Sequence, residues 1–170
     1  MKRGYDLPKR LIDVVAAGAG LVLVSPLLLA AAVAIRLEDG GPALFRQTRA
    51  GRGRRPFRIF KFRSMVVDAD RLLDASGKPT GQRVTRVGKL LRFTSLDELP
   101  QLLNVLLGDM SLVGPRPGLP EQAERYDATQ LRRFEVRPGL TGLAQVKGRN
   151  TLKWSERLRY DVEYVDGRSL

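Results

Sequence analysis

The chain has 170 residues and carries a formal net charge of +12. A chain of this length can bury a core without disulfides. It contains no Cys and no His, which excludes thiol nucleophiles, Ser-His-Asp triads and zinc sites of the usual ligand set. Acid-base or nucleophilic chemistry must therefore come from Asp, Glu, Lys, Tyr or Ser. The metal that best suits such oxygen ligands is Mg²⁺.

An uncharged segment covers residues 14–35 and departs from aliphatic residues and Gly only at Ser25 and Pro26. As a helix it would rise roughly 33 Å, about the thickness of the hydrocarbon core of a bilayer. Both flanks are basic, so the positive-inside rule places both ends on the same side. Pro26 removes a helix hydrogen bond near the middle, and Ser25 can satisfy a freed carbonyl. We expect a re-entrant membrane helix over 1–39, broken at Ser25-Pro26; a kinked spanning helix and a buried soluble helix are the alternatives.

Basic residues follow the apolar segment directly. Eight of them, and no acidic residue, lie between Arg46 and Arg63. Such charge suits a polyanion, which can be nucleic acid, an anionic bilayer or a phosphorylated substrate. Its position favours anionic membrane lipids, where each basic side chain contributes about 1 kcal/mol. Nucleic acid is not expected, because aromatic side chains for base stacking are confined to residues 57–62. Asp13, close to Lys9, is expected at the membrane interface with its charge paired.

Residues 40–170 are expected to form one cytoplasmic catalytic domain docked on the membrane, so that the fold class is α+β, mainly helical with little sheet. Residues 57–62 alternate as in a strand or hairpin, and residues 74–82 read as a loop. Apolar periodicity predicts three helices, over 84–91, over 99–106 with Gly108 after it, and from 152 onward with Trp154, Leu158, Val162 and Val165 on one face. Rigid turns are expected at Gly114–Pro117 and Pro138-Gly139.

The stretch around Asp97 and Glu98 is the most informative for chemistry. Ser95-x-x-Glu98 has the form of a capping box, in which these residues would only cap a helix. Pro100 would then lie inside that helix, so a start one or two residues later fits better and puts Asp97 in the first turn. There the helix dipole keeps the carboxylate ionised and the backbone N–H groups can bind phosphate. An ionised Asp can act as a nucleophile, two adjacent carboxylates attract Mg²⁺, and Arg92 adds positive charge.

Two further stretches present arginine side chains. In Gly114-Pro115-Arg116-Pro117 the prolines restrict the backbone around Arg116. Its guanidinium can therefore meet a phosphate with little loss of entropy, although a plain rigid turn explains the same residues. The stretch from Arg137 to Asn150 is rich in Gly, which allows close backbone approach to a ligand, and Arg149 could reach a phosphate.

Together these motifs give the chain a close resemblance to the bacterial sugar transferases, the small monotopic phosphoglycosyl transferases. The resemblance runs over almost the whole chain. Its matching stretches follow one another in the same order, and they are Lys9–Asp13, Ser25-Pro26, Phe45–Gly51, Lys61–Met65, Ser95–Asn104, Gly108–Pro117 and Arg137–Gln145.

The resemblance implies an enzyme that transfers a sugar 1-phosphate from a UDP-sugar to undecaprenyl (polyprenyl) phosphate, with release of UMP. This reaction begins the synthesis of a glycoconjugate such as exopolysaccharide, O-antigen, capsule or glycoprotein. The resemblance implies Asp97 as the nucleophile of a covalent phosphosugar intermediate, with Glu98 and Asp97 at Mg²⁺. The residues that it places around the substrate phosphates are Lys61, Arg92, Arg116, Arg149, Pro115, Pro117 and Gln145. It also implies a re-entrant helix in the bacterial cytoplasmic membrane, with the catalytic domain on the cytoplasmic face.

The sequence differs from the family pattern at its ends. Members usually continue past the Tyr160–Tyr164 region with another helical stretch, whereas this chain stops at Leu170. No extension with several spans precedes the apolar segment, so the minimal catalytic form is expected. Two other functions remain: a basic membrane-anchored binding protein without catalysis, and an ordinary glycosyltransferase that releases UDP. No residue pattern indicates the sugar or an oligomeric state.

Overall fold

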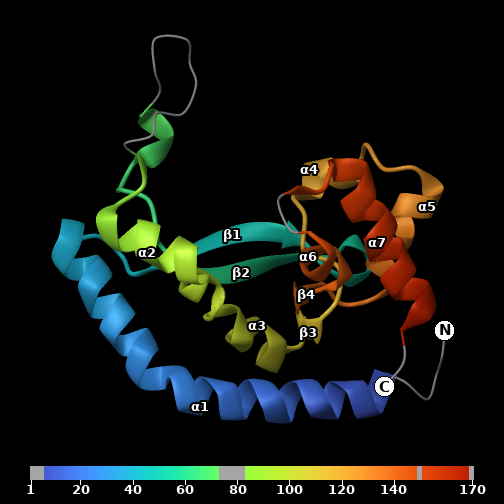
Figure 1. The fold of residues 1–170 in the computed structure, drawn as a ribbon, viewed down its shortest axis with the longest axis horizontal. Coiled ribbons are helices and arrows are strands. Elements are labelled where there is room, and N and C mark those ends of the chain that lie inside the picture. Colours follow the sequence, from blue (N-terminus) through green and yellow to red (C-terminus); the bar gives the residue numbers. More distant parts are fainter. Residues whose placement is uncertain (1–5, 73–82, 149–150, 169–170) are drawn as a thin grey trace. The chain divides into compact units, whose positions relative to one another are not determined.

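The computed structural model describes residues 6–72, 83–148 and 151–168 (Figure 1). The chain divides into two compact units. Unit 1 comprises Met1–Leu21, Gln47–Ile59 and Gln101–Leu170, and unit 2 comprises Val22–Arg46 and Phe60–Pro100. The fold is mainly helical, and among the described residues its strands form only two two-stranded sheets, β1-β2 and β3-β4.

The elements follow one another in a simple order. The α-helices are α1 (Asp6–Asp39), α2 (Arg86–Thr94), α3 (Gln101–Leu107), α4 (Pro120–Ala123), α5 (Ala128–Leu131), α6 (Leu143–Lys147) and α7 (Trp154–Gly167). The strands are β1 (Leu44–Ala50), β2 (Pro56–Phe62), β3 (Ser111–Val113) and β4 (Gly139–Thr141). Short 3-10 turns include η1 (Arg52–Arg54), η2 (Ala69–Arg71), η4 (Leu96–Glu98) and η5 (Arg132–Glu135).

Helix α1 is the long apolar helix that the sequence predicted. It has a window of mean hydropathy 2.3 of which only 6% is buried, so it is long and apolar enough to cross a membrane. Pro26 lies inside α1 and cannot donate to the carbonyl of Val22. The hydroxyl of Ser25 donates to that carbonyl instead, at 2.8 Å. The predicted compensation by Ser25 is therefore confirmed, while the re-entrant path of the helix stays a prediction.

Unit 2 has a small core where α1, β2 and α2 meet. Ala31 and Ile35 lie four residues apart on one face of α1 and pack with Phe62 and Leu91. Thr85 caps the start of α2, because its hydroxyl accepts a first-turn amide hydrogen bond at 2.9 Å. Phe62 of β2 lies in this core. The core therefore fixes the backbone next to Lys61 and Ser64.

Unit 1 is built around a close approach of two backbone segments. Strands β3 and β4 pair in parallel, with Ser111 opposite Gly139 and Val113 opposite Thr141. A Cβ at Gly139 would lie 2.1 Å from the amide nitrogen of Gly114, so only glycine permits this approach. Unit 1 also contains a core made by Ala50, Ala123 and Phe134, with Tyr126 and Leu131 packed against it.

Most of the predicted elements are confirmed. Residues 57–62 belong to β2, which pairs with β1, and the three predicted helices are α2, α3 and α7. Gly108 follows α3 with φ +92°, as a residue ending a helix should. In α7 the side chains of Leu158, Val162 and Val165 are buried, as predicted.

Two predictions about local structure are wrong. Pro138-Gly139 is not a turn, because Gly139 begins β4. A strand of three residues is too short to show alternation in the sequence. Trp154 is 47% exposed and does not belong to the buried face of α7. The predicted loop over 74–82 lies outside the described residues. The predicted division into 1–39 and 40–170 stays a prediction.

Candidate active site

The carboxylates Asp97 and Glu98 lie in η4, which follows α2 in unit 2. Ser95 ends α2 with φ 59° and makes no capping hydrogen bond with any described residue, so the capping box does not form. Helix α3 begins only at Gln101, directly after Pro100. A proline has no N–H to donate and is therefore accommodated before a first helical turn. Asp97 therefore lies in the first turn of η4, and the prediction is wrong only in assigning it to the first turn of α3.

Two predicted phosphate-binding residues of unit 2 lie beside these carboxylates. The ammonium of Lys61 donates to Glu98 Oε1 at 2.8 Å, and the two side chains are 21% and 18% exposed. Arg92 is an exposed cation in the last turn of α2, and its Nε donates to Ser64 Oγ at 2.8 Å. The charges of both cations act on Asp97. Unit 2 therefore gathers two carboxylates and two cations at the end of α2.

The pKa of Asp97 is raised above the usual value of an aspartate. Partial burial is the largest cause and the charge of Glu98 adds to it, while Lys61 and Arg92 act in the opposite direction. We had expected a helix N-terminus to stabilise the charge, but burial dominates instead. A partly desolvated carboxylate that keeps cations beside it can attack a phosphorus once those cations screen the negative charge of the phosphate.

The donor set at Asp97 and Glu98 fits Mg²⁺ of the kind that proteins bind together with a phosphorylated substrate. Among the residues that the structure describes, no group of three or more acidic side chains could hold a metal ion. Mg²⁺ commonly takes only one or two protein carboxylates and completes its shell with phosphate oxygens and water. These two residues can supply that number.

The Gly114–Pro117 loop lies in unit 1, directly after β3. Its backbone is fixed by β4, since Gly114 N donates to the carbonyl of Thr141 at 2.8 Å and Gly139 N donates to the carbonyl of Pro115 at 2.9 Å. Pro115 is buried and Arg116 is exposed. The loop is therefore held on its backbone while its arginine side chain reaches the surface.

The remaining predicted site residues follow β4. Gln145 lies in α6, where Nε2 donates to the carbonyl of Leu140 at 3.4 Å. Its Oε1 is buried and accepts no hydrogen bond from the described part of the chain. Within the described residues, Gln145 therefore keeps an unused acceptor in α6, the helix that follows β4. Arg149 lies outside the described residues.

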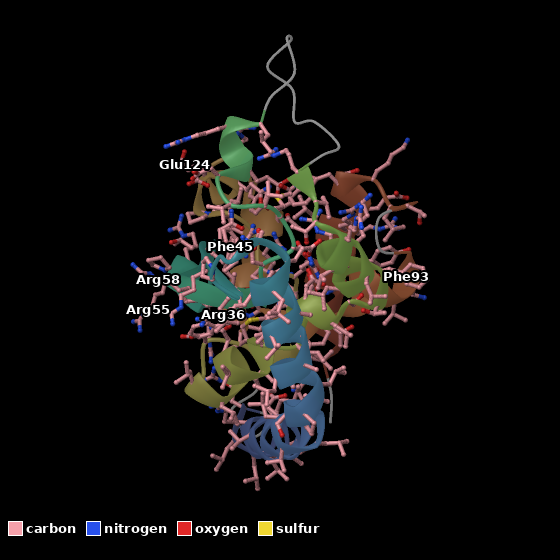
Figure 2. All side chains as sticks on the ribbon, turned by 90° about the vertical axis from the view of Figure 1, so that its left-hand side faces the viewer. Arg36, Phe45, Arg55, Arg58, Phe93 and Glu124 are labelled. Carbon is pink, nitrogen blue, oxygen red and sulfur yellow. The ribbon has the colours of Figure 1, made fainter. Side chains whose placement is uncertain are left out.

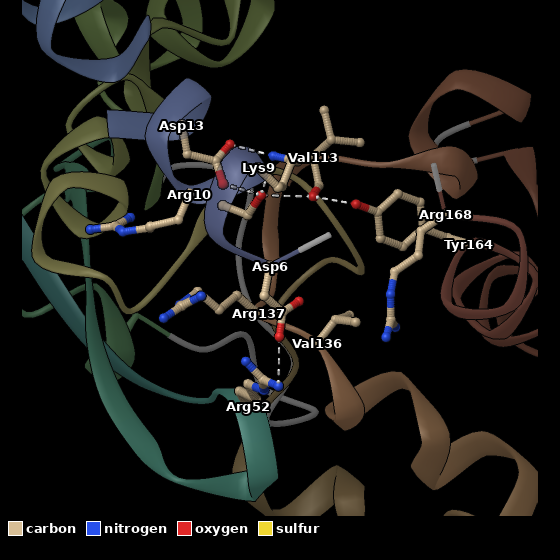
Figure 3. A pocket seen from close by; sticks show the side chains of 11 residues that line it. Asp6, Lys9, Arg10, Asp13, Arg52, Val113, Val136, Arg137, Tyr164 and Arg168 are labelled. Atoms are coloured by element: carbon tan, nitrogen blue, oxygen red, sulfur yellow. Dashed lines mark hydrogen bonds and ion pairs between the residues drawn. The ribbon is translucent and has the colours of Figure 1, made fainter. Parts of the chain in front are cut away.

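The start of α1 carries a polar network that sequence reasoning found only in part (Figure 3). Asp13 is 2% exposed, pairs with Lys9, and accepts hydrogen bonds from Ser111 Oγ at 2.8 Å and Leu112 N at 3.1 Å. The pairing of Asp13 is confirmed, but the side chain is buried in protein. The i, i+4 spacing to Lys9 was visible in the sequence, whereas nothing pointed to Ser111.

The other end of α1 is anchored within unit 2. Asp39 pairs with Arg63, whose Nε also donates to the carbonyl of Pro42 at 2.7 Å. Glu38 accepts from the amide of Arg86 at 2.6 Å. Arg63 is one of the eight basic residues that we assigned to a lipid surface. Because it is only 8% exposed and already paired, that part of the prediction is wrong.

Comparison with known proteins identifies the family of this chain. A sequence profile described as bacterial sugar transferase matches residues 4–170. The UDP-glucose:undecaprenyl-phosphate glucose-1-phosphate transferase of Caulobacter vibrioides is 51% identical over 97% of this chain and 65% of that protein. The galactosyl transferase CpsE of Streptococcus agalactiae is 42% identical over 99% of this chain and 40% of that protein.

A third relative is named for another sugar. The UDP-N-acetylgalactosamine-undecaprenyl-phosphate N-acetylgalactosaminephosphotransferase of Aeromonas hydrophila is 47% identical over 84% of this chain and 34% of that protein. The chain thus spans 65% or less of the length of these three relatives. The match nevertheless takes in the carboxylate pair, both ends of α1 and the Gly114–Pro117 loop. The chain therefore belongs to the bacterial sugar transferase family.

Proposed function

We propose that this chain transfers a sugar 1-phosphate from a UDP-sugar to polyprenyl phosphate, in bacteria undecaprenyl phosphate, and releases UMP. The reaction would begin the synthesis of a glycoconjugate such as exopolysaccharide, O-antigen, capsule or glycoprotein. The observation that carries the proposal is the partly buried carboxylate of Asp97, with Glu98, Lys61 and Arg92 around it. The names of two relatives, which describe transfer to undecaprenyl phosphate from UDP-glucose and UDP-N-acetylgalactosamine, support it.

The reaction would proceed in two displacements at one phosphorus. First an oxygen of Asp97 attacks the phosphorus that bears the sugar, the bond to the bridging oxygen breaks, and UMP leaves. A phosphate oxygen of the acceptor then attacks the same phosphorus, the bond to Asp97 breaks, and polyprenyl diphosphate sugar forms. Both nucleophiles are anions near neutral pH. No proton has to be removed, which is consistent with a chain that has no His.

The charged neighbours of Asp97 would carry the electrostatic part of the catalysis. Lys61 and Arg92 would contact phosphate oxygens, with Arg116 and Arg149 as further phosphate ligands and Pro115, Pro117 and Gln145 shaping the binding site. Glu98 and Asp97 would hold Mg²⁺, which when bound neutralises charge that builds up on the diphosphate. Because Lys61 is paired with Glu98, an incoming phosphate or metal would have to share that contact.

The acceptor combines an anionic head with a long hydrocarbon tail. On α2 the exposed Arg92 stands in sequence between Leu90 and Phe93, which are 61% and 89% exposed. Figure 2 shows Phe93 on the outside of this helix. Leu90 and Phe93 are three residues apart and share a face of α2, where they can meet a hydrocarbon tail, while the cation of Arg92 lies on an adjacent face for the anionic head. This arrangement supports polyprenyl phosphate as the acceptor.

For the membrane, we propose that α1 enters and leaves on the cytoplasmic face of the bacterial inner membrane. The start of α1 is tied to Ser111 and Leu112, which come after the helix in the chain. A single crossing would put Asp13 on the opposite side from these partners and leave a buried carboxylate without them. Among the described residues, α1 is the one helix long and apolar enough to cross. The exposed basic residues that follow it would contact anionic lipids.

Single-cysteine labelling tests this topology, since the chain has no Cys of its own. We expect Lys2→Cys and Lys153→Cys to resist a membrane-impermeant maleimide applied to intact spheroplasts. Both should react once the membrane is opened. Labelling of Lys2→Cys from outside, with Lys153→Cys still protected, would show a spanning helix.

Nucleotide release tests the reaction itself. The full chain in lipid nanodiscs is given Mg²⁺, undecaprenyl phosphate and one UDP-sugar at a time, including UDP-glucose, UDP-galactose and UDP-N-acetylgalactosamine. We expect UMP with one donor and none without the acceptor lipid beyond a single turnover. Release of UDP would show ordinary glycosyl transfer. Absence of any nucleotide with every donor would contradict the proposal.

A further inference from the structure

Arg133 is a buried arginine in unit 1 that the proposed reaction does not use. It lies in η5 and pairs with Asp161 of α7 at 2.7 Å, and both side chains are 4% exposed. Its Nη1 donates to the hydroxyl of Tyr126 at 3.0 Å, and its Nη2 donates to the backbone carbonyl of Arg116 at 2.6 Å. The guanidinium carbon also lies 5.5 Å from the ring centre of Tyr126 and 5.6 Å from that of Phe134.

This arrangement is a poor way to gain stability. A buried ion pair often stabilises a fold less than apolar side chains of the same size, because both charges lose their water. Burial raises the pKa of Asp161 to about 6, although Arg133 acts to lower it. The Nε of Arg133 is also buried and has no acceptor in the described part of the chain. The cost of the pair calls for a role other than stability.

The contact with Arg116 supplies such a role. The planar guanidinium presents several N–H groups in fixed directions, so one side chain can hold a carboxylate, a hydroxyl and a carbonyl at once. The carbonyl that it holds belongs to the arginine of the Pro115–Pro117 loop. The neighbouring residue Gly118 is fixed as well, since its carbonyl accepts from Ala50 N at 3.0 Å.

We infer that Arg133, itself held by Asp161 and Tyr126, is a positioning residue that fixes the backbone of Arg116 for contact with the diphosphate of the nucleotide sugar. The inference rests on the proposed function, because it assigns Arg116 to the substrate phosphates. Arg133 touches no substrate. It acts by limiting the conformations that the loop can adopt before the donor binds.

Arg133→Lys removes this hold while keeping a positive charge beside Asp161. A lysine ammonium cannot reach the three partners together. We expect KM for the UDP-sugar to rise about tenfold, as for loss of one charge-assisted hydrogen bond, with kcat nearly unchanged. Tyr126→Phe removes one support of Arg133 and should give a smaller rise in KM.

Asp166→Asn provides a matched control. Asp166 of α7 pairs with Arg132 of η5, so this pair joins the same two elements as Arg133 and Asp161. It is exposed, however, and no contact with Arg116 is found in the described structure. The control should leave KM for the donor unchanged. A similar rise in KM in the control and in Arg133→Lys would overturn the inference.

A double-mutant cycle separates positioning from a general structural role. If Arg133 acts through Arg116, then Arg133→Lys should raise KM little further in a chain that already carries Arg116→Ala. Additive effects of the two substitutions on KM would show that Arg133 acts elsewhere. Urea unfolding of each variant, at the concentration used for kinetics, ensures that only folded protein is compared.

Binding of UDP-glucose and of pyrophosphate, measured by calorimetry in nanodiscs, distinguishes failure of the inference from failure of the proposed function. Suppose that the wild-type chain releases no UMP but binds either probe about tenfold more tightly than Arg133→Lys does. The inference about Arg133 would then be supported and the proposed reaction would be contradicted. If the wild-type chain releases UMP, and if KM and affinity are equal in the wild-type chain and in Arg133→Lys, the proposed reaction is supported and the inference about Arg133 is contradicted. Binding of neither probe by the wild-type chain overturns the inference, because Arg116 would then meet no diphosphate.

Discussion

Each compact unit has an ion pair beside a residue that is proposed to meet the donor phosphates. These residues are Asp97 in unit 2 and Arg116 in unit 1. In unit 2 Lys61 pairs with Glu98, and about a fifth of each side chain is exposed (21% and 18%). In unit 1 Arg133 pairs with Asp161, and only 4% of each is exposed. The first pair lies next to Asp97, and the second holds the carbonyl of Arg116. The two pairs have the same charges and differ in side-chain exposure. The more exposed Lys61–Glu98 pair can meet a substrate, whereas the buried Arg133–Asp161 pair can only hold the backbone.

The acidic groups of the two regions differ in what surrounds them. Burial raises the pKa of both Asp97 and Asp161. The second cause differs, because Asp97 also feels the charge of Glu98 beside it, whereas Asp161 faces the guanidinium of Arg133 and the hydroxyl of Tyr126. A group with mixed neighbours is suited to changing its bonding partner during a reaction. A group enclosed with one cation is suited to keeping its partner.

The largest effect should come from Asp97→Asn, which removes the nucleophile and keeps the shape of the side chain. We expect UMP release to fall at least about a thousandfold while the unfolding transition stays in place. Steady-state release with the best donor measures this loss. Substantial turnover in a sample free of wild-type protein would show that Asp97 is not the nucleophile. The group beside Lys61–Glu98 would then have no more direct role in the reaction than the Arg133–Asp161 pair.

Glu98→Gln should have the next largest effect, because it removes a charge from the partly buried Lys61–Glu98 pair and from the proposed metal ligands. We expect turnover to fall roughly a hundredfold, as when one charge-stabilising group is lost. The Mg²⁺ concentration for half-maximal rate should also rise. A metal titration that coincides with that of the wild-type chain would count against a ligand role for Glu98.

The buried pair should reveal itself in the pH dependence of stability. The folded-state pKa of Asp161, about 6, lies above the usual 3.8, so its contribution to stability is complete below pH 4 and is lost as pH rises through 6. Between pH 7 and pH 5 the free energy of unfolding should therefore rise by about 1 kcal/mol in the wild-type chain relative to Asp161→Asn. Urea unfolding followed by the single Trp, Trp154, measures the difference.

The interpretation of that experiment is simple in either direction. An equal pH slope in the two proteins would mean that Asp161 does not titrate between pH 5 and pH 7, as for a carboxylate that stays ionised beside Arg133. The Arg133–Asp161 pair would then stabilise the fold as well as position the backbone of Arg116. It would differ less from the Lys61–Glu98 pair than we infer.

Much of the candidate site could be predicted because its signals are local. Asp97 and Glu98 are adjacent in sequence, and the two prolines around Arg116 restrict it directly. Periodicity revealed α7 because Leu158, Val162 and Val165 are buried at helical spacing. It revealed α2 through Val87 and Leu91, which are four residues apart and pack in the core of unit 2, although Leu90 of the same pattern is 61% exposed. Pro100 indicated that a helix cannot begin early at Ser95, although the intervening turn η4 left no signal of its own.

The rest depends on contacts between residues far apart in the chain. Strands β3 and β4 have three residues each, too few for a pattern. The carbonyl of Arg116 is an ordinary backbone group, so nothing in its sequence identifies Arg133 as the donor. Ser111 likewise becomes a partner of Asp13 only through folding. Such contacts are set by tertiary packing, which single-sequence patterns do not encode.

The contact between Asp13 and Ser111 also imposes an order on how the protein is made. The two residues are 98 positions apart, so α1 is synthesised long before its partner exists. During that interval Asp13 can pair with Lys9 of the same helix but not yet with Ser111 or Leu112. The membrane helix can be locked at its start only after residue 112 has been synthesised and folded. A chain interrupted before that point would carry an α1 whose start is not held by Ser111 and Leu112.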